Sequence, residues 1–299
     1  MLKDRFKKLL PYILVIKAIK WAIVLAIFAY SSFASAQDGV PTAQDYTNFF
    51  NTKTLVVMDN NPMSDFNFKI KEVMESTWKL TKFDFIPSSE YEAKRRDPGY
   101  SFLLVTTVTF DKDDTKARYS FLSLLMGKDV YKETDMPDIC SVPLSYVRVD
   151  EESYIYKLEA FVRFAQEHAK LMHANPDLIS KMPFKYYNKN IKDLKGKKLL
   201  LVESDLVPSL RNEAKLKKLY PYEVEIVTKE DIEAAISRRD PDVVFLHKVG
   251  PEGTKFKARC YKILVGAADS QFYYFDYHMV TTSEPDAISE KDIKRMGSK

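Results

Sequence analysis

The chain has 299 residues, of which 45% are hydrophobic and 13% aromatic. This composition excludes an intrinsically disordered protein, because disordered chains lack the apolar residues that a core needs. The 46 basic and 42 acidic residues give a formal net charge of only +4, so the chain as a whole has no strong field to attract nucleic acid.

Residues 1–36 have the pattern of a cleavable secretory signal peptide. Basic residues precede the uncharged run Trp21–Tyr30, and small residues follow it up to Ala36. A membrane-spanning helix needs about 20 consecutive apolar residues, so a retained anchor is the weaker interpretation. We expect cleavage after Ala36, export to the periplasm or the medium, and no membrane insertion of the mature chain.

Removal of the leader changes the charge balance, because residues 1–36 contain six basic residues and one acidic residue. The mature chain then has 40 basic and 41 acidic residues, and we expect neither nucleic acid nor an anionic membrane as its partner. Its two cysteines are too few for a disulfide framework. An oxidising compartment permits a Cys140–Cys260 disulfide, and two buried free thiols are the alternative.

Three short motifs occur twice in the mature chain, in the same order and at offsets of 144, 143 and 141 residues. The three pairs are Leu55–Asp59 with Leu199–Glu203, Arg95–Pro98 with Arg238–Pro241, and Lys116–Arg118 with Lys257–Arg259. One such match would be weak, but three collinear matches predict that the chain contains two copies of one unit.

The predicted elements follow the same order in both copies. The first copy has strands at 54–58, 82–86, 100–110, 118–126 and 144–149, with helices after the first two. The second copy has strands at 198–202, 223–227, 243–249, 260–265 and 272–282, again with helices after the first two. Helical crossovers make the first three strands parallel, and hairpins make the last two antiparallel. We therefore predict an α/β fold of two tandem β-α-β-α-β-β-β units with mixed sheets.

The longest predicted helix, 151–175, lies between the copies, and its apolar face is expected to pack against both. A polar linker at 178–196 follows it. The predicted organisation is a leader at 1–36, a first repeat at 37–150, a connecting helix and linker at 151–196, and a second repeat at 197–299.

Catalytic motifs are missing from the sequence. The turns after the first strands contain no glycine and are acidic, which opposes a dinucleotide or phosphate site. His168 and His173 are five residues apart on a helix and do not share a face, and we expect both to be partly exposed. The sequence therefore predicts no cofactor and no metal centre.

Acidic residues follow the first strand of each copy: Asp59 in the first, and Glu203 and Asp205 in the second. Open α/β sheets bind ligands at the carboxyl ends of their parallel strands, and these oxygens suit a hard cation. Asp59, Glu203 and Asp205 are therefore the candidate ligand-binding residues. Ordinary polar turns are the alternative interpretation.

The strand at 272–282 is rich in tyrosine. Simple alternation places Tyr273 and Tyr277 on one face and Tyr274 on the other. One of these faces must belong to the core, and the other is a candidate surface for a protein partner, since tyrosine is enriched at interfaces. Core tyrosines on both faces are the alternative.

Two stretches carry a resemblance to known proteins: the lysine-rich leader that ends Ala34-Ser35-Ala36-Gln37, and the run Glu72–Trp78 followed by Phe83–Ser88. They resemble uncharacterised exported proteins typical of Bacteroidetes. The second stretch is also similar to the small α/β domain that opens the Tol-system periplasmic β-propeller protein. That resemblance implies recognition of a protein partner in the cell envelope, and it assigns no role to any single residue.

Three functions from different classes remain. The first is a non-enzymatic envelope module that binds or assembles proteins. The second is a two-lobed protein that binds a small molecule between its copies. The third is a divergent metal-dependent hydrolase, whose candidate residues would be Asp59, Glu203, Asp205 and His278. The missing catalytic motifs favour the first function.

Overall fold

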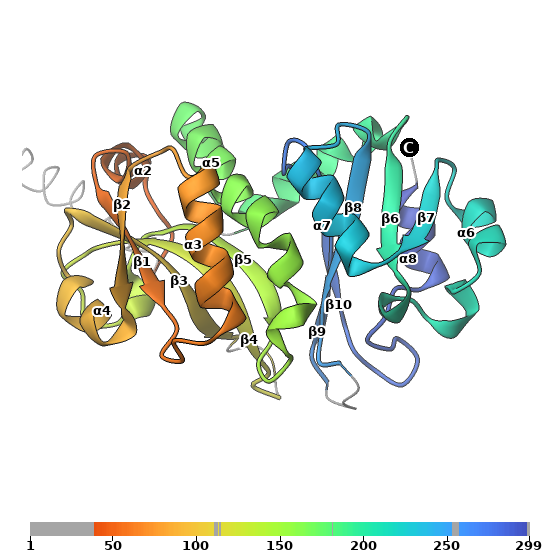
Figure 1. The fold of residues 1–299 in the computed structure, drawn as a ribbon, viewed down its shortest axis with the longest axis horizontal. Coiled ribbons are helices and arrows are strands. Elements are labelled where there is room, and N and C mark those ends of the chain that lie inside the picture. Colours follow the sequence, from red (N-terminus) through yellow and green to blue (C-terminus); the bar gives the residue numbers. More distant parts are fainter. Residues whose placement is uncertain (1–38, 111–112, 114, 181, 253–256, 298–299) are drawn as a thin grey trace, which may run out of the picture. The chain divides into compact units, whose positions relative to one another are not determined.

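The structure is a computed structural model that describes residues 39–110, 113, 115–180, 182–252 and 257–297. The predicted leader at 1–36 lies outside these residues. Two five-stranded mixed sheets with helices on their faces form the framework (Figure 1). The predicted α/β class with two similar sheet units is confirmed.

The first sheet contains β1 (Lys53–Met58), β2 (Lys82–Pro87), β3 (Tyr100–Thr109), β4 (Arg118–Met126) and β5 (Asp138–Tyr146). Their spatial order is β2-β1-β3-β4-β5. The strand β1 pairs in parallel with β2 and β3, and β4 and β5 continue the sheet in antiparallel fashion. This pattern follows from the connections, because parallel neighbours need a crossover and antiparallel neighbours need only a hairpin.

The second sheet contains β6 (Lys198–Val202), β7 (Val224–Val227), β8 (Val243–Val249), β9 (Arg259–Gly266) and β10 (Phe272–Met279). Their order is β7-β6-β8-β9-β10 when the sheet is read from the same edge. The parallel and antiparallel pairings also match those of the first sheet. The two sheets therefore share one topology, as the duplication predicts.

Seven α-helices lie in the described part of the chain: α2 (Ala43–Phe49), α3 (Asp65–Thr77), α4 (Ser88–Lys94), α5 (Leu158–Ala174), α6 (Glu213–Leu219), α7 (Lys229–Arg238) and α8 (Glu290–Met296). Helices α3 and α4 are the crossovers of the first sheet, and α6 and α7 are those of the second. Helix α5 follows the last strand of the first sheet and packs on α3, and α8 follows the last strand of the second and packs on α6. The repeated unit thus includes a closing helix that the sequence analysis assigned to the connection.

The repeated Arg-Arg-Asp-Pro motif ends the second crossover helix of each copy. Helix α4 ends at Lys94 and α7 at Arg238. Just beyond, an Oδ1 of Asp97 accepts a hydrogen bond from the Gly99 amide at 2.8 Å, and that of Asp240 accepts one from the Asp242 amide at 3.1 Å. Both aspartates therefore close the same turn before the third strand.

The register of the sheets corrects one detail of the repeat. Lys53 and Lys198 each begin the first strand of a copy, and each forms an ion pair with an acidic residue of the neighbouring strand. Lys53 lies opposite Tyr100, and Lys198 lies opposite Val243. The first strands are thus related by 145 residues and not by the 144 of the sequence match. The difference matters because a one-residue shift exchanges the two faces of a strand.

Helix α5 ties the two copies together, as predicted. Its Gln166 side chain donates to the Thr77 carbonyl at 3.1 Å and accepts from the Lys79 amide at 2.8 Å, both in the first copy. On the other side, Arg163 donates to the carbonyl of Ala267 at 2.8 Å in the second copy. One hydrophobic core runs through α3, α5, α7 and both sheets.

The two sheets also meet directly, through β4 and β9. The Tyr119 hydroxyl contacts the Arg259 backbone, and the Arg259 guanidinium donates two 2.8 Å hydrogen bonds to Asp113. The rings of Phe121 and Tyr261 lie 6.2 Å apart between centroids. Phe121 and Tyr261 occupy corresponding positions in their sheets, since they pair with the corresponding residues of β3 and β8.

The two cysteines are free and buried, so the possible Cys140–Cys260 disulfide is not formed. Cys140 belongs to the shared core. Cys260 lies in β9, opposite His278 and beside Asp286. It is on the face of the second sheet that points away from the shared core. The two thiols therefore lie in different environments, which explains why they do not meet.

Candidate functional site

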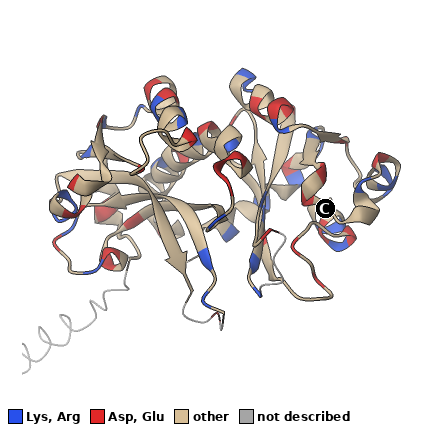
Figure 2. Ribbon diagram, turned by 60° about the horizontal axis from the view of Figure 1, so that its bottom comes forward, with Lys and Arg blue, Asp and Glu red and all other residues tan. Residues whose placement is uncertain are grey.

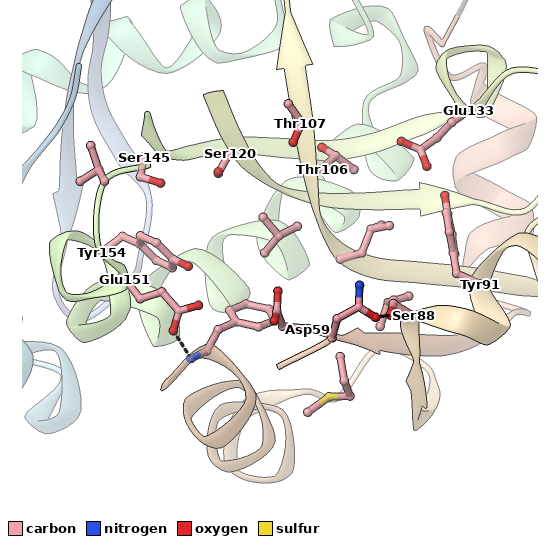
Figure 3. Close-up of a pocket in the computed structure, with 17 residues that line it drawn as sticks. Asp59, Ser88, Tyr91, Thr106, Thr107, Ser120, Glu133, Ser145, Glu151 and Tyr154 are labelled. Atoms are coloured by element: carbon pink, nitrogen blue, oxygen red, sulfur yellow. Dashed lines mark hydrogen bonds between the residues drawn. The ribbon is translucent and has the colours of Figure 1, made fainter. Parts of the chain in front are cut away.

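A cavity of about 510 Å³ lies at the carboxyl edge of the first sheet, where β1 and β3 end (Figure 3). Its walls come from those two strands, from β4 and β5, and from the segment that leads into α5. It does not lie between the two copies, where the sequence analysis placed the site of a two-lobed binding protein. Its position agrees with the general rule for ligand sites in open α/β sheets.

The cavity extends around the end of the sheet, so residues from both faces of the sheet line it. On the side of α3, the cross-strand neighbours Thr107, Ser120 and Ser145 offer hydroxyl groups from one face. On the side of α4, Thr106 and Tyr91 line the wall. In Figure 3 the serine and threonine side chains of these strands lie above the predicted Asp59.

Three carboxylates line the cavity: Asp59, Glu133 and Glu151. An Oδ1 of Asp59 accepts a hydrogen bond from the Asn61 amide at 2.7 Å, which fixes the turn after β1. The Glu151 carboxylate accepts one at 2.9 Å from the amide of Phe66 in the first turn of α3. Such a carboxylate is well placed, because free amides at a helix N-terminus favour negative charge.

The lining residues include no lysine, arginine or histidine among those that the structure describes. Burial, together with the nearby Glu133 carboxylate, raises the pKa of Tyr91, so this phenol stays a neutral donor. The cavity therefore offers hydroxyl groups and negative charge. Such a lining can bind hydroxyl and ammonium groups, and it repels phosphate and carboxylate.

The corresponding edge of the second sheet is closed by buried charges. The Lys248 ammonium lies 3.2 Å from Oδ1 of Asp286, and both side chains are buried. Lys157, which precedes α5, enters the same cluster, and burial lowers its pKa to about 8. Burial also raises the pKa of Asp205, although Lys157 and Lys248 act in the opposite direction.

The structure does not unite the predicted ligand residues into one site. Asp59 lines the cavity of the first sheet, Asp205 joins the charge cluster of the second, and Glu203 is exposed. Within the described residues, no group of three or more histidine, cysteine, aspartate or glutamate side chains could hold a metal ion.

The predicted tyrosine surface is corrected by the structure. Tyr273 and Tyr274 are each only 6% exposed and belong to the same hydrophobic cluster. A β-bulge between Phe272 and Tyr274 breaks the alternation of side chains. The rings of Tyr273 and Tyr274 therefore turn to the same face of the sheet. Tyr277 is half-buried and packs beside Arg259 and Tyr261. These residues therefore serve packing and do not form an exposed patch.

The remaining candidate, His278, lines a second cavity of about 480 Å³ between β10 and α8. One ring nitrogen lies 2.9 Å from the Pro285 carbonyl. The charged groups around this cavity are mostly paired with one another, as in the Asp276–Arg295 and buried Lys262–Asp292 pairs. This cavity offers less unpaired chemistry to a ligand than the first one does.

Sequence reasoning missed Glu151, Lys157 and Asp286. All three belong to segments that follow the last strand of a copy, and their contacts are with residues far away in the chain. An acidic residue at matching positions in the two segments would have been a signal in the sequence. Glu151 and Asp286 lie at different distances from the last strands of their copies, so the sequence shows no such match. Only the folded chain brings them to the sheet edges.

Comparison with known proteins identifies no relative. No family model matches the chain, and neither a curated protein nor a solved structure matches it. In the described part of the chain, no helix has the length and apolar character to cross a membrane. Acidic and basic residues are interspersed over its helices and loops (Figure 2).

Proposed function

We propose that the protein is an exported, non-enzymatic binding protein that holds a small hydroxyl-rich molecule at the carboxyl edge of its first sheet. The observation that carries this proposal is the lining of the 510 Å³ cavity, whose described residues bring hydroxyls and carboxylates together without a basic side chain. The leader pattern at residues 1–36 supports export. The buried positions of Tyr273 and Tyr274 remove the main candidate surface for a protein partner.

The ligand class follows from the charges. Each carboxylate can accept hydrogen bonds from ligand hydroxyls, and each threonine or serine hydroxyl can donate or accept. An anionic ligand would have to approach Asp59, Glu133 and Glu151 with no basic side chain among the lining residues that the structure describes, which costs free energy at short range. Neutral and cationic ligands are therefore favoured over anions.

Three related sugars, one neutral, one cationic and one anionic, test this proposal. The thermal midpoint should rise with glucose and with glucosamine, and it should not change with glucuronate. Thr107→Val should weaken binding by roughly fivefold, since it removes one hydrogen bond of about 1 kcal/mol. Thr47→Val, on α2 and outside the cavity, is the matched control.

Two results would contradict the proposal. One is equal stabilisation by glucuronate and glucose, which the acidic lining forbids. The other is a ligand response that Thr107→Val and Thr47→Val leave equally unchanged, because the binding would then occur elsewhere on the protein.

A further inference from the structure

The shared topology allows the two sheet edges to be compared residue by residue. Because Tyr100 and Val243 hold the same position, the sequence Phe102-Leu103 of β3 corresponds to Phe245-Leu246 of β8. Three residues beyond each phenylalanine, at the edge of the sheet, stand Val105 in the first copy and Lys248 in the second. Both side chains lie on the face that the first crossover helix covers.

In the second copy this edge contains a complete ion pair. The Lys248 ammonium contacts the carboxylate of Asp286, which belongs to the segment between β10 and α8. Gly250 permits the approach, because a Cβ at this position would overlap the Asp286 carboxylate. The side chains of Lys248 and Asp286 are only 3% and 8% exposed. This ion pair therefore fills the carboxyl edge of the second sheet.

In the first copy the acidic part of this arrangement is present and the lysine is missing. Glu151 lies in the corresponding segment, between β5 and α5, and Asp59 follows β1. The position of the lysine is taken by Val105, which is 38% exposed and lines the cavity. Thr107 stands where the second copy has Gly250. An open cavity therefore remains where the second copy has an alkylammonium group.

We propose that the cavity of the first copy binds an alkylammonium group of its ligand, in the place that the Lys248 side chain fills in the second copy. This inference rests on the proposed function and specifies its ligand class: a primary amine whose charged end meets Glu151 and Asp59 and whose carbon chain lies over Val105. In the second copy the Lys248 side chain already occupies this place, so each chain binds one amine.

The native protein can be tested with three ligands of equal length. At pH 7, n-butylamine is fully charged, since alkylammonium groups titrate near the lysine value of about 10.4. Calorimetric titration should show one n-butylamine bound per chain. Its affinity should exceed that of n-butanol by about tenfold or more, since a hydrogen bond to a charged group contributes about 1.5–3 kcal/mol. Butyrate should not bind.

Variants at the same position test the correspondence between the copies. Val105→Lys should raise the thermal midpoint and reduce n-butylamine binding at least about tenfold, because the chain then supplies its own ammonium. Val105→Met has a similar length without charge, and it should not raise the midpoint. The gain of Val105→Lys should disappear when Glu151→Gln is added, since the new ammonium then loses its partner.

The possible outcomes separate this inference from the proposed function. If n-butanol binds as tightly as n-butylamine while sugars still bind, the ammonium site is wrong and the polar binding site stands. If neither sugars nor amines bind in the cavity, both are wrong. If Val105→Lys does not fold, the three-ligand titration of the native chain still decides.

Discussion

His168 shows how the fold controls a single titratable residue. It was expected to be partly exposed, but only 1% of it is exposed, and it packs against Phe164. Its Nδ1 lies 2.9 Å from the Tyr187 hydroxyl. Burial lowers the pKa of His168 to about 3. The imidazole therefore stays neutral in the folded protein under conditions in which an unfolded histidine, with a pKa near 6.5, takes up a proton.

This difference predicts how His168 affects acid stability. Between pH 6.5 and 3 the unfolded state binds the extra proton, so the free energy of unfolding should fall as the pH is lowered through this window. The histidine contributes a slope of about 1.4 kcal/mol per pH unit. His168→Gln should remove that part of the slope in urea unfolding curves measured from pH 7 to pH 4.

The control is His173→Gln, which changes an exposed histidine on the same helix. If both variants show the same pH dependence as the native chain, His168 titrates normally and the assigned cause is wrong.

At the scale of elements, the segment expected to be a linker has a structural task. Residues 183–194 form a 3-10 helical segment that packs along β10, the edge strand of the second sheet. The Asn188 side chain accepts from the Phe275 amide at 2.6 Å and donates to its carbonyl at 3.0 Å. Asn190 donates to the Phe272 carbonyl at 2.9 Å. These side-chain amides form the hydrogen bonds that a neighbouring strand would otherwise form with β10. They therefore protect β10 from pairing with another chain.

The edge can be opened by one substitution. Asn188→Ala should leave the Phe275 amide without its acceptor, lower the free energy of unfolding by about 1–2 kcal/mol, and speed hydrogen exchange at that amide. Asn175→Ala is the control, because the Asn175 side chain donates to the Leu171 carbonyl of the preceding helix and lies outside β10. Unchanged exchange at Phe275 in Asn188→Ala would contradict the protective role.

Sequence patterns predicted the elements better than their registers. The order of strands and crossover helices could be read from the repeated motifs and the short apolar runs. The one-residue offset of β6 could not, because Leu199–Leu201 are all buried and a strand buried on both faces shows no alternation to mark its register. The bulge that turns Tyr273 inward was equally hidden, since it depends on pairing with β9. Of the site, only Asp59 could be predicted, because it follows its strand directly.

At the scale of the whole molecule, the two copies share one core. Helix α5 carries Phe164, whose ring stacks on Phe272 of β10 with 3.7 Å between the ring centroids. The same cluster contains residues of α3 in the first copy and of α7 in the second. An interface of this apolar kind favours cooperative unfolding over independent domains.

Calorimetry should therefore show a single unfolding transition for residues 39–297, with equal calorimetric and van't Hoff enthalpies. Phe164→Ala should lower the stability of that one transition by about 3–5 kcal/mol. Two resolved transitions in the native chain would show that the copies are separate cooperative units.

The contact between the two copies has a consequence for how their sheet edges can differ. Phe121 and Tyr261 touch although they hold corresponding positions, whereas the shared core joins α3 of the first copy to α7 of the second, so the copies meet through unlike faces. In a homodimer every substitution appears in both subunits, so both edges must hold the same residues. In a single chain each copy has its own sequence. Val105 can therefore leave the edge of the first sheet open, while the Lys248 side chain fills the edge of the second. A single chain can therefore hold unlike residues at two sheet edges that share one topology.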